Sequence, residues 1–335
     1  MQKEEEKVVL KVNHESDIPK YQQLVDGITN AIAENILQKG DLLPSVNAIC
    51  KTYQLSRDTV FKAYSILKEQ NVIDSVPNKG YYVAGETRKV LLVLDTFKAY
   101  KEVLYHSVVN NLADNVIIDV QFHHYNIDVF KTIINNGIGK YYKYVVMNFN
   151  HKEIAPTLSS ISNDKLLLID WNIQASKKSN YVFQDFGGAF YEALKEAADL
   201  FKKYKKIAFV YPDFTNHPWE TVEYFKKFCK DFGFEYEILT DSKKFQIEKG
   251  IAYISVSDRI LGEFLEQCKD KNFEPGKDVG FLSYNETPMK KFIYKGISVI
   301  STDFKEMGTK AAAFITHDEE TKCYVPTKLI LRESL

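Results

Sequence analysis

The apolar positions of this sequence change their spacing near residue 88, and this change divides the chain into two parts. From Tyr21 to Ile36 apolar residues fall three or four positions apart, which predicts a helix, and Gly40 is predicted to end it as a C-terminal cap. Ser45 and Ser56 each precede another helical pattern and are predicted to cap those helices through their hydroxyl groups. The first part is therefore predicted to begin with three short helices.

A β-hairpin is predicted to follow the third helix. Residues 72–75 and 81–83 read as strands, and the Pro77-Asn78-Lys79-Gly80 segment between them reads as a turn. Three helices and a hairpin form the layout of a winged helix-turn-helix, which places its third helix in the DNA major groove. The helical period leaves five side chains on or near the outer face of that helix: Arg57, Asp58, Phe61, Lys62 and Ser65.

The second part of the chain alternates strand-length apolar runs with helical stretches, a rhythm typical of parallel sheets covered by helices. The runs are residues 90–94, 117–122, 144–147, 166–169, 207–210, 252–256, 279–282 and 297–300. This is more than one small sheet needs, so we predict an α/β domain of two doubly wound lobes. In such sheets ligands bind beyond the carboxyl ends of the strands, which places the expected site in a cleft between the lobes.

These patterns predict four segments. We expect a flexible tail over residues 1–14, a small α+β winged helix-turn-helix domain over 15–84, a linker over 85–89 and the two-lobed α/β domain over 90–335.

Composition narrows the class of protein. The 335 residues are 45% hydrophobic and 13% aromatic, enough to fill sizeable cores, and no apolar run is long enough for a membrane span or a signal peptide. The four cysteines lie far apart without C-x-x-C spacing, which argues against a metal cluster or a disulfide framework. His123 and His124 are adjacent on a predicted strand and point to opposite faces, so we expect no metal site and no cofactor. We expect a cytoplasmic protein.

Charge alone does not suggest nucleic acid. Residues 1–85 contain ten Lys or Arg against eleven Asp or Glu, although residues 44–83 are slightly basic. The case for DNA depends on the motif at the start of the third helix, where Arg57 can pair with guanine or a phosphate and the Thr59 hydroxyl suits a phosphate oxygen. A capped surface helix with no such role is the alternative interpretation.

Over residues 19–83 the motifs Leu43-Pro44-Ser45, Ser56-Arg57-Asp58-Thr59-Val60 and Gly80-Tyr81-Tyr82-Val83 resemble the GntR family of bacterial transcription regulators. The resemblance implies a homodimer that binds a palindromic operator. Asn47 stands where the family usually has an arginine, and Asn78 where its wing usually has a glycine. The implied DNA-binding residues are Ser45, Asn47, Ser56, Arg57, Asp58, Thr59, Lys62, Asn78, Lys79 and Gly80.

An ordered series of short motifs beyond residue 88 resembles the sugar-binding domain of LacI-type repressors and periplasmic sugar-binding proteins. It includes Leu168-Ile169-Asp170, Ser257-Asp258, Ser283-Tyr284-Asn285-Glu286 and Thr302-Asp303-Phe304. The resemblance implies a sugar effector that closes the cleft and alters operator affinity. The predicted ligand-binding residues are Phe97, Tyr100, Asp170, Trp171, Asp185, His217, Trp219, Ser257, Asn285 and Thr302. His217 and Trp219 are included because they lie beyond the carboxyl end of the strand expected at 207–210.

Trp171 and Asn285 replace charged residues that are common in that family, which favours a neutral sugar, for example a deoxyhexose such as L-fucose. Core packing for Trp171 and helix capping for Asp170 and Asp185 are the structural alternatives; Asp258 is interpreted as a cap. No G-x-S-x-G, G-x-x-x-x-G-K-[ST], G-x-G-x-x-G or H-E-x-x-H motif occurs, so an enzyme is not expected. A sugar-binding interaction module and an enzyme fused to a DNA-binding domain stay as alternatives to the regulator.

Overall fold

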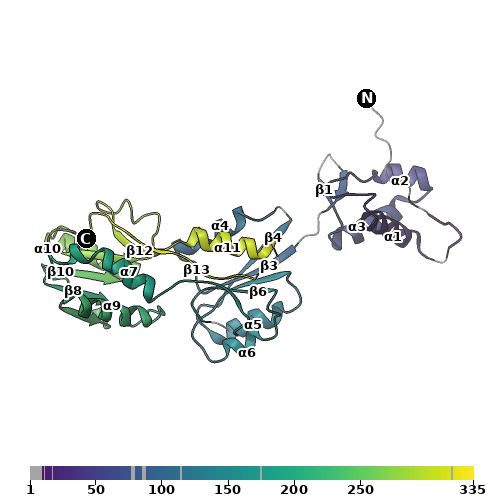
Figure 1. Cartoon of the computed structure of the whole chain (residues 1–335). Helices are drawn as coiled ribbons and strands as arrows, with labels where there is room; N and C mark the ends of the chain where they lie inside the picture. The colour runs from purple at the N-terminus through teal and green to yellow at the C-terminus, as the bar shows by residue number, and fades with distance from the viewer. Residues whose placement is uncertain are drawn as a thin grey trace. The chain divides into compact units, whose positions relative to one another are not determined.

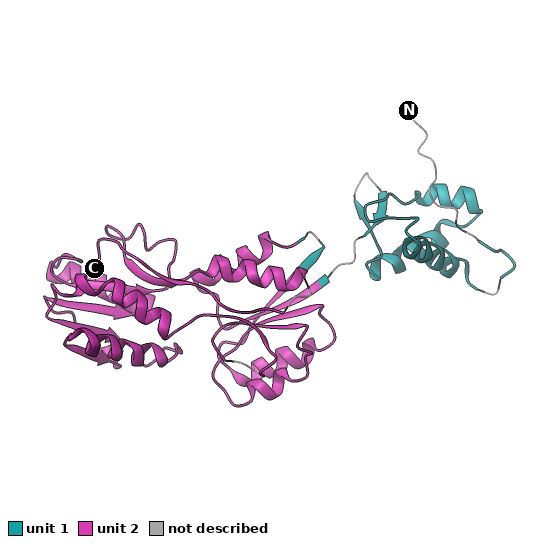
Figure 2. Ribbon diagram, viewed as in Figure 1, with its two compact units in different colours: residues 1–88, 113–117 teal, residues 89–112, 118–335 magenta. Residues whose placement is uncertain are grey.

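The computed structural model describes residues 10, 12–16, 18–76, 80–84, 88–113, 115–173, 176–317 and 320–335. They divide into two compact units, one of Met1–Arg88 with Ala113–Ile117 and one of Lys89–Leu112 with Ile118–Leu335 (Figure 2). Within these ranges no helix is long and apolar enough to cross a membrane.

Unit 1 contains the three helices and the hairpin that the sequence predicts (Figure 1). The elements are α1 (Lys20–Ala33), α2 (Val46–Tyr53), α3 (Arg57–Glu69), β1 (Ile73–Val76) and β2 (Gly80–Val83). The two strands pair antiparallel, with Ile73 opposite Val83. The winged helix-turn-helix layout is therefore confirmed.

Both predicted serine caps are present. Ser45 Oγ accepts from the backbone N–H of Ala48 at 3.1 Å, and Ser56 Oγ accepts from that of Thr59 at 3.2 Å. The predicted end of the first helix is wrong, because α1 already stops at Ala33 and Gly40 lies beyond it. Gly40 instead adopts φ +87° in a turn, and its N–H donates to the Val83 carbonyl at 3.0 Å, which ties the turn to β2.

The core of unit 1 forms between the inner faces of its helices and the hairpin. Leu24 and Ile28 of α1 and Val60, Ala63, Tyr64 and Leu67 of α3 are all completely buried. Leu10, which lies inside the predicted tail, joins this core and its N–H donates to the Tyr53 hydroxyl at 2.9 Å. Burial of this kind fixes α3 by its inner face and leaves the opposite face to solvent.

Unit 2 contains two sheets, as the two predicted lobes require, and each has six strands, so the described residues contain more strands than the eight apolar runs indicate. The first has the order β13-β7-β6-β5-β3-β4 and the second the order β14-β12-β11-β10-β8-β9. The first sheet consists of β3 (Arg88–Leu94), β4 (Val116–Phe122), β5 (Lys143–Met147), β6 (Leu166–Asp170), β7 (Asn180–Phe183) and β13 (Lys322–Tyr324). The second consists of β8 (Lys206–Val210), β9 (Tyr236–Leu239), β10 (Ile251–Ser255), β11 (Gly280–Tyr284), β12 (Ser298–Thr302) and β14 (Thr327–Ile330).

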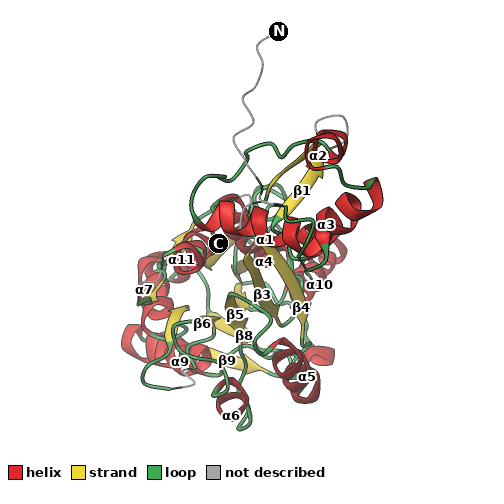
Figure 3. Ribbon diagram, turned by 90° about the vertical axis from the view of Figure 1, so that its right-hand side faces the viewer, coloured by secondary structure: helices red, strands yellow, loops and turns green. Residues whose placement is uncertain are grey.

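Helices cover these strands (Figure 3). They are α4 (Ala99–Asn110), α5 (Ile127–Gly137), α6 (Ile154–Leu158), α7 (Gly188–Glu196), α8 (Ala198–Phe201), α9 (Glu220–Phe232), α10 (Asp258–Lys271) and α11 (Phe304–Thr316), with a short 3₁₀ turn at Ser242–Lys244. The central strands pair in parallel, while β12 and β14 pair antiparallel. The predicted two-lobed α/β architecture is confirmed.

The two sheets are joined by three chain crossings. The chain leaves the first sheet after β7, returns from the second after β12 and crosses again between β13 and β14. Parallel sheets place the carboxyl ends of their strands at one edge, so loops from both lobes can contribute to a single site at these edges.

Candidate functional sites

The outer face of α3 carries the candidate DNA-binding residues. Arg57, Asp58, Phe61 and Lys62 are all exposed, whereas Val60, Ala63, Tyr64 and Leu67 on the opposite face are buried in the core of unit 1. The Tyr64 hydroxyl donates to the Pro44 carbonyl at 2.7 Å, which anchors α3 to the start of α2. The inner face of α3 is thus fixed by the core, and the N-terminal half of its outer face is exposed to solvent.

The remaining predicted DNA-binding residues surround this face. Ser45 and Asn47 are exposed at the N-terminus of α2, and Gly80 is exposed at the start of β2 with φ +98°. The Thr59 hydroxyl lies 2.8 Å from Ser56 Oγ, so it shares its hydrogen-bonding capacity with the cap. Lys62 Nζ lies 3.8 Å from the centroid of the Tyr21 ring. The predicted wing residues Asn78 and Lys79 lie outside the described residues.

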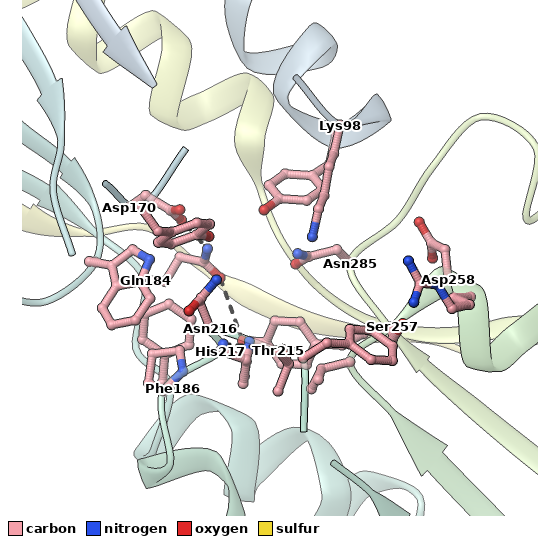
Figure 4. A pocket seen from close by; sticks show the side chains of 18 residues that line it. Lys98, Asp170, Gln184, Phe186, Thr215, Asn216, His217, Ser257, Asp258 and Asn285 are labelled. Carbon is pink, nitrogen blue, oxygen red and sulfur yellow. Dashed lines mark hydrogen bonds between the residues drawn. The ribbon is translucent and has the colours of Figure 1, made fainter. Parts of the chain in front are cut away.

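Unit 2 contains a cavity of about 360 Å³, a size usual for small-molecule sites (Figure 4). Its aromatic wall consists of Tyr100, Tyr125, Trp171, Phe186, Phe214 and Tyr284. Its polar lining consists of Lys98, Asp170, Gln184, Thr215, Asn216, His217, Ser257, Asp258, Arg259 and Asn285. These residues come from the carboxyl ends of strands in both sheets, and aromatic faces beside hydrogen-bonding side chains suit a sugar ring with its hydroxyls.

Gln184 connects the two lobes at the cavity. Its side-chain N–H donates to the Asp170 carboxylate at the end of β6, in the first sheet. Its carbonyl accepts from the Thr302 hydroxyl at 2.8 Å and from the Tyr284 hydroxyl at 3.5 Å, both in the second sheet. Burial raises the pKa of Asp170. A movement of one lobe against the other would therefore have to break or rearrange this buried network.

Asn285 carries an unsatisfied acceptor at the cavity. It follows β11 with φ +61°, and its side-chain Oδ1 is buried with no hydrogen-bond partner among the described residues. A buried acceptor without a partner is unfavourable, so a ligand hydroxyl that donates to it would gain stabilisation. Among the described lining residues, Asn285 is therefore the strongest candidate for a direct hydrogen bond to a ligand.

Lys290 holds the Asn285 loop in position. Its ammonium group is buried and donates to the Tyr284 carbonyl at 3.1 Å and the Asn285 carbonyl at 2.7 Å. It also pairs at 2.7 Å with Asp258, which lines the cavity at the start of α10. Burial lowers the pKa of Lys290. Asp258, interpreted from the sequence as a cap, is therefore the partner of a buried lysine.

His217 is a neutral member of the lining. Burial lowers its pKa to about 3, and its Nε2 lies 2.8 Å from the Thr221 hydroxyl. Its ring packs edge-to-face against Tyr284 and Phe186, with centroid distances of 4.7 and 5.2 Å. At neutral pH this residue supplies hydrogen-bonding capacity and apolar surface without a positive charge.

A buried ion pair contacts Tyr125, one of the aromatic residues that line the cavity. Lys101 of α4 pairs with Asp95, which follows β3, and both side chains are almost completely buried. The Tyr125 hydroxyl donates to the same carboxylate. Burial lowers the pKa of Lys101 to about 8, so the lysine is still mainly protonated at pH 7. This cluster joins a cavity residue to α4, the helix that packs against α11.

Six of the ten predicted ligand-binding residues line the cavity: Tyr100, Asp170, Trp171, His217, Ser257 and Asn285. The other four do not. Phe97 is largely exposed, and Trp219 donates its indole N–H to Glu223 at 2.7 Å. The Asp185 carboxylate accepts from the N–H groups of Gly187 and Ala189 at the start of α7, and the Thr302 hydroxyl bonds Gln184 and Thr327.

The lining residues that sequence reasoning missed follow strands or precede helices. Gln184 follows β7, a strand of only four residues that begins with the polar Asn180, and Tyr125 follows β4 by three residues with φ +58°. Their place after a strand is the signal that could have pointed to them. His123 is buried and His124 exposed, and the described residues hold no group of three or more His, Cys, Asp or Glu suited to a metal ion.

Residues 20–83 match the family described as bacterial regulatory proteins, gntR family. This segment is 36% identical over 70 residues to YcxD of Bacillus subtilis strain 168, an uncharacterized HTH-type transcriptional regulator. The matched region covers 21% of this chain and only 16% of that relative. The resemblance of unit 1 to this family is therefore confirmed over residues 20–83.

Solved structures resemble the other part of the chain. The trehalose repressor of Escherichia coli superposes with a TM-score of 0.62 at 14% identity, over 73% of this chain and all of that one. A LacI family regulator of Lactobacillus casei with bound glucose superposes with a TM-score of 0.63 at 9% identity, over 74% of this chain and 99% of that one. At these identities the likeness establishes the fold, which is that of LacI-type effector domains.

Proposed function

We propose that this protein is a transcription regulator that binds operator DNA as a homodimer and is controlled by a small sugar in the cavity of unit 2. One observation carries the proposal: a gntR-type DNA-binding segment shares a chain with a domain of the LacI-effector fold, whose cavity contains the unsatisfied Asn285 acceptor. A regulator of this kind binds its DNA and its sugar without converting either of them, so the proposal requires no catalytic residues.

The cavity favours a neutral sugar. Trp171 and Tyr284 offer aromatic surface for the C–H faces of a sugar ring, while Asn285 and Gln184 offer amide groups for its hydroxyls. The formal charges of the lining also balance, because Lys98 and Arg259 stand against Asp170 and Asp258, so no net charge favours an ionised ligand. A deoxyhexose such as L-fucose combines hydroxyls with an apolar methyl and is the ligand that we propose first.

The cavity also offers a route from ligand to DNA. A sugar that binds residues of both lobes favours the lobe arrangement that it fits best, which would rearrange the buried Gln184 network between Asp170 and Thr302. Because the lobes belong to one chain with the DNA-binding segment, a change in lobe arrangement would alter the placement of the two α3 helices in the dimer. Ligand and operator would then alter each other's affinity by the same factor.

Ligand binding can be tested by thermal shift. The full chain is heated with each member of a panel of monosaccharides that includes L-fucose, D-glucose, uronic acids and sugar phosphates. A sugar that binds the native state raises the melting temperature. Asn285→Gly keeps the positive φ but removes the acceptor, so its shift should be lost, whereas Trp219→Phe, outside the cavity, should keep it. A panel without any shift would contradict the sugar effector.

DNA binding can be tested by selection of binding sites from random double-stranded DNA. The full chain should enrich a palindromic sequence, and Arg57→Ala should weaken binding to it about tenfold or more, the effect of losing one bidentate base contact. Lys68→Ala removes the same charge from the far end of α3, where the lysine already pairs with Asp74 at 3.0 Å, and should have little effect. An interaction module without a DNA function would enrich no sequence.

A further inference from the structure

An exposed phenylalanine stands on the polar outer face of α3. Phe61 is 41% exposed and does not belong to the hydrophobic core of unit 1. The other aromatic side chains among the described residues of this unit are tyrosines, and all of these are partly or fully buried. A large apolar ring is thus exposed to solvent on the same helix face as Arg57 and Lys62.

The side chains beside the Phe61 ring indicate what kind of partner this surface can bind. Phe61 lies one helical turn after Arg57, whose guanidinium carbon lies 5.8 Å from the ring centroid. A guanidinium beside the ring suits a negatively charged or hydrogen-bonding partner rather than an apolar protein surface. Asp58, exposed in the same first turn, would repel a phosphate but can accept from the cytosine amino group. Together these groups fit base edges better than the phosphate backbone.

We propose that Phe61 selects a thymine in the operator by contact with its C5-methyl group. The inference rests on the proposed DNA-binding function and deepens it. A phenyl ring has no hydrogen-bonding group, and in the major groove the thymine methyl is the apolar group that distinguishes one base pair from another. Arg57, one turn nearer the N-terminus, then reads a neighbouring position, for which its bidentate geometry favours guanine.

The structure also explains why the ring can reach a base. The N-terminal half of a recognition helix reaches furthest into the groove, and Phe61 is the fifth residue of α3. Val60 and Tyr64 lock the helix into the core from the opposite side, so the ring is presented by a rigid support. Contact with the methyl group removes apolar surface of both partners from water, which is the source of the selectivity.

The test compares thymine with uracil, which differs only by the missing methyl group. An operator is first selected from random double-stranded DNA with the full chain. Each symmetry-related thymine pair is then replaced by deoxyuridine, and affinities are measured by fluorescence anisotropy for the wild type, Phe61→Ala and Ile36→Ala. Ile36 is a matched control because it is an apolar side chain of similar exposure, 48% against 41% for Phe61, but lies outside α3. Thermal melting checks that each variant is folded.

We expect one thymine position at which deoxyuridine weakens wild-type binding about fourfold per half-site, the effect of burying one methyl group. Phe61→Ala should weaken binding to the thymine operator and lose the discrimination at that position, while Ile36→Ala should retain both. Equal thymine-to-uracil ratios in wild type and Phe61→Ala would overturn the inference while leaving DNA binding intact. A full chain that selects no sequence would overturn the proposed function, and this inference with it.

Discussion

The buried ion pair of Lys101 and Asp95 makes the sharpest stability prediction. Both side chains are almost completely buried, and the lysine is charged at pH 7 although burial lowers its pKa to about 8. Lys101→Met would leave the Asp95 carboxylate in the interior without its cation, with the Tyr125 hydroxyl and the N–H and hydroxyl of Thr96 as donors. Removal of one partner from such a pair costs about 3 to 5 kcal/mol of unfolding free energy.

The double variant Asp95→Asn with Lys101→Met should recover most of that loss. The asparagine is neutral and can still accept from the Tyr125 hydroxyl, so no uncompensated charge stays buried. Urea unfolding followed by tryptophan fluorescence reports on this part of the molecule, because both tryptophans, Trp171 and Trp219, belong to unit 2. The coupling energy comes from the double-mutant cycle of the two single variants and the double variant.

A matched control is the exposed pair of Lys131 and Glu153, 2.7 Å apart with side chains about 40% exposed. Lys131→Met should change the unfolding free energy far less than Lys101→Met does, because solvent screens an exposed pair. The reasoning would be refuted if Lys101→Met cost no more than this control, or if the losses of Asp95→Asn and Lys101→Met simply added in the double variant.

Two further predictions concern the pH dependence and the fold of unit 2. Burial lowers the pKa of His123 to about 4, so between pH 6.5 and 5 the unfolded chain takes up a proton that the folded chain does not, and stability should fall by on the order of 1 to 2 kcal/mol. His123→Asn should reduce this slope in urea titrations at several pH values and leave the part that comes from His217, whose pKa burial lowers to about 3, whereas the exposed His124→Asn should retain the full slope. Asp185→Ala removes the acceptor of two N–H groups at the start of α7 and should cost about 1 kcal/mol. Its thermal shift with a bound sugar should persist, and a lost shift would place Asp185 in the ligand site.

The sequence predicts the strands at the centre of each sheet because these are buried on both faces. The apolar runs at β3, β5, β8 and β10 therefore stand out. It does not predict β9, β13 and β14, which lie at sheet edges and keep polar residues on their exposed side. The inner strand β7 was also missed, because Asn180-Tyr181 breaks its apolar run.

The candidate site follows the same logic. Trp171 and Asn285 could be anticipated because each follows a strand that the apolar runs mark clearly. Gln184 could not, since it follows the unpredicted β7, and its partners Asp170 and Thr302 lie far away in sequence. The orphan acceptor of Asn285 and the pair formed by Lys290 depend on packing between distant segments, which a single sequence does not reveal.

The central claim is that one chain couples a sugar to an operator, and a reciprocal titration tests it most directly. The affinity of the sugar found by thermal shift is measured by calorimetry with the full chain alone and with saturating operator, and the operator affinity is measured with and without the sugar. Linkage requires the two ratios to be equal and different from one. Sugar titrations that coincide with and without operator would contradict the account, because binding would then carry no information to the DNA.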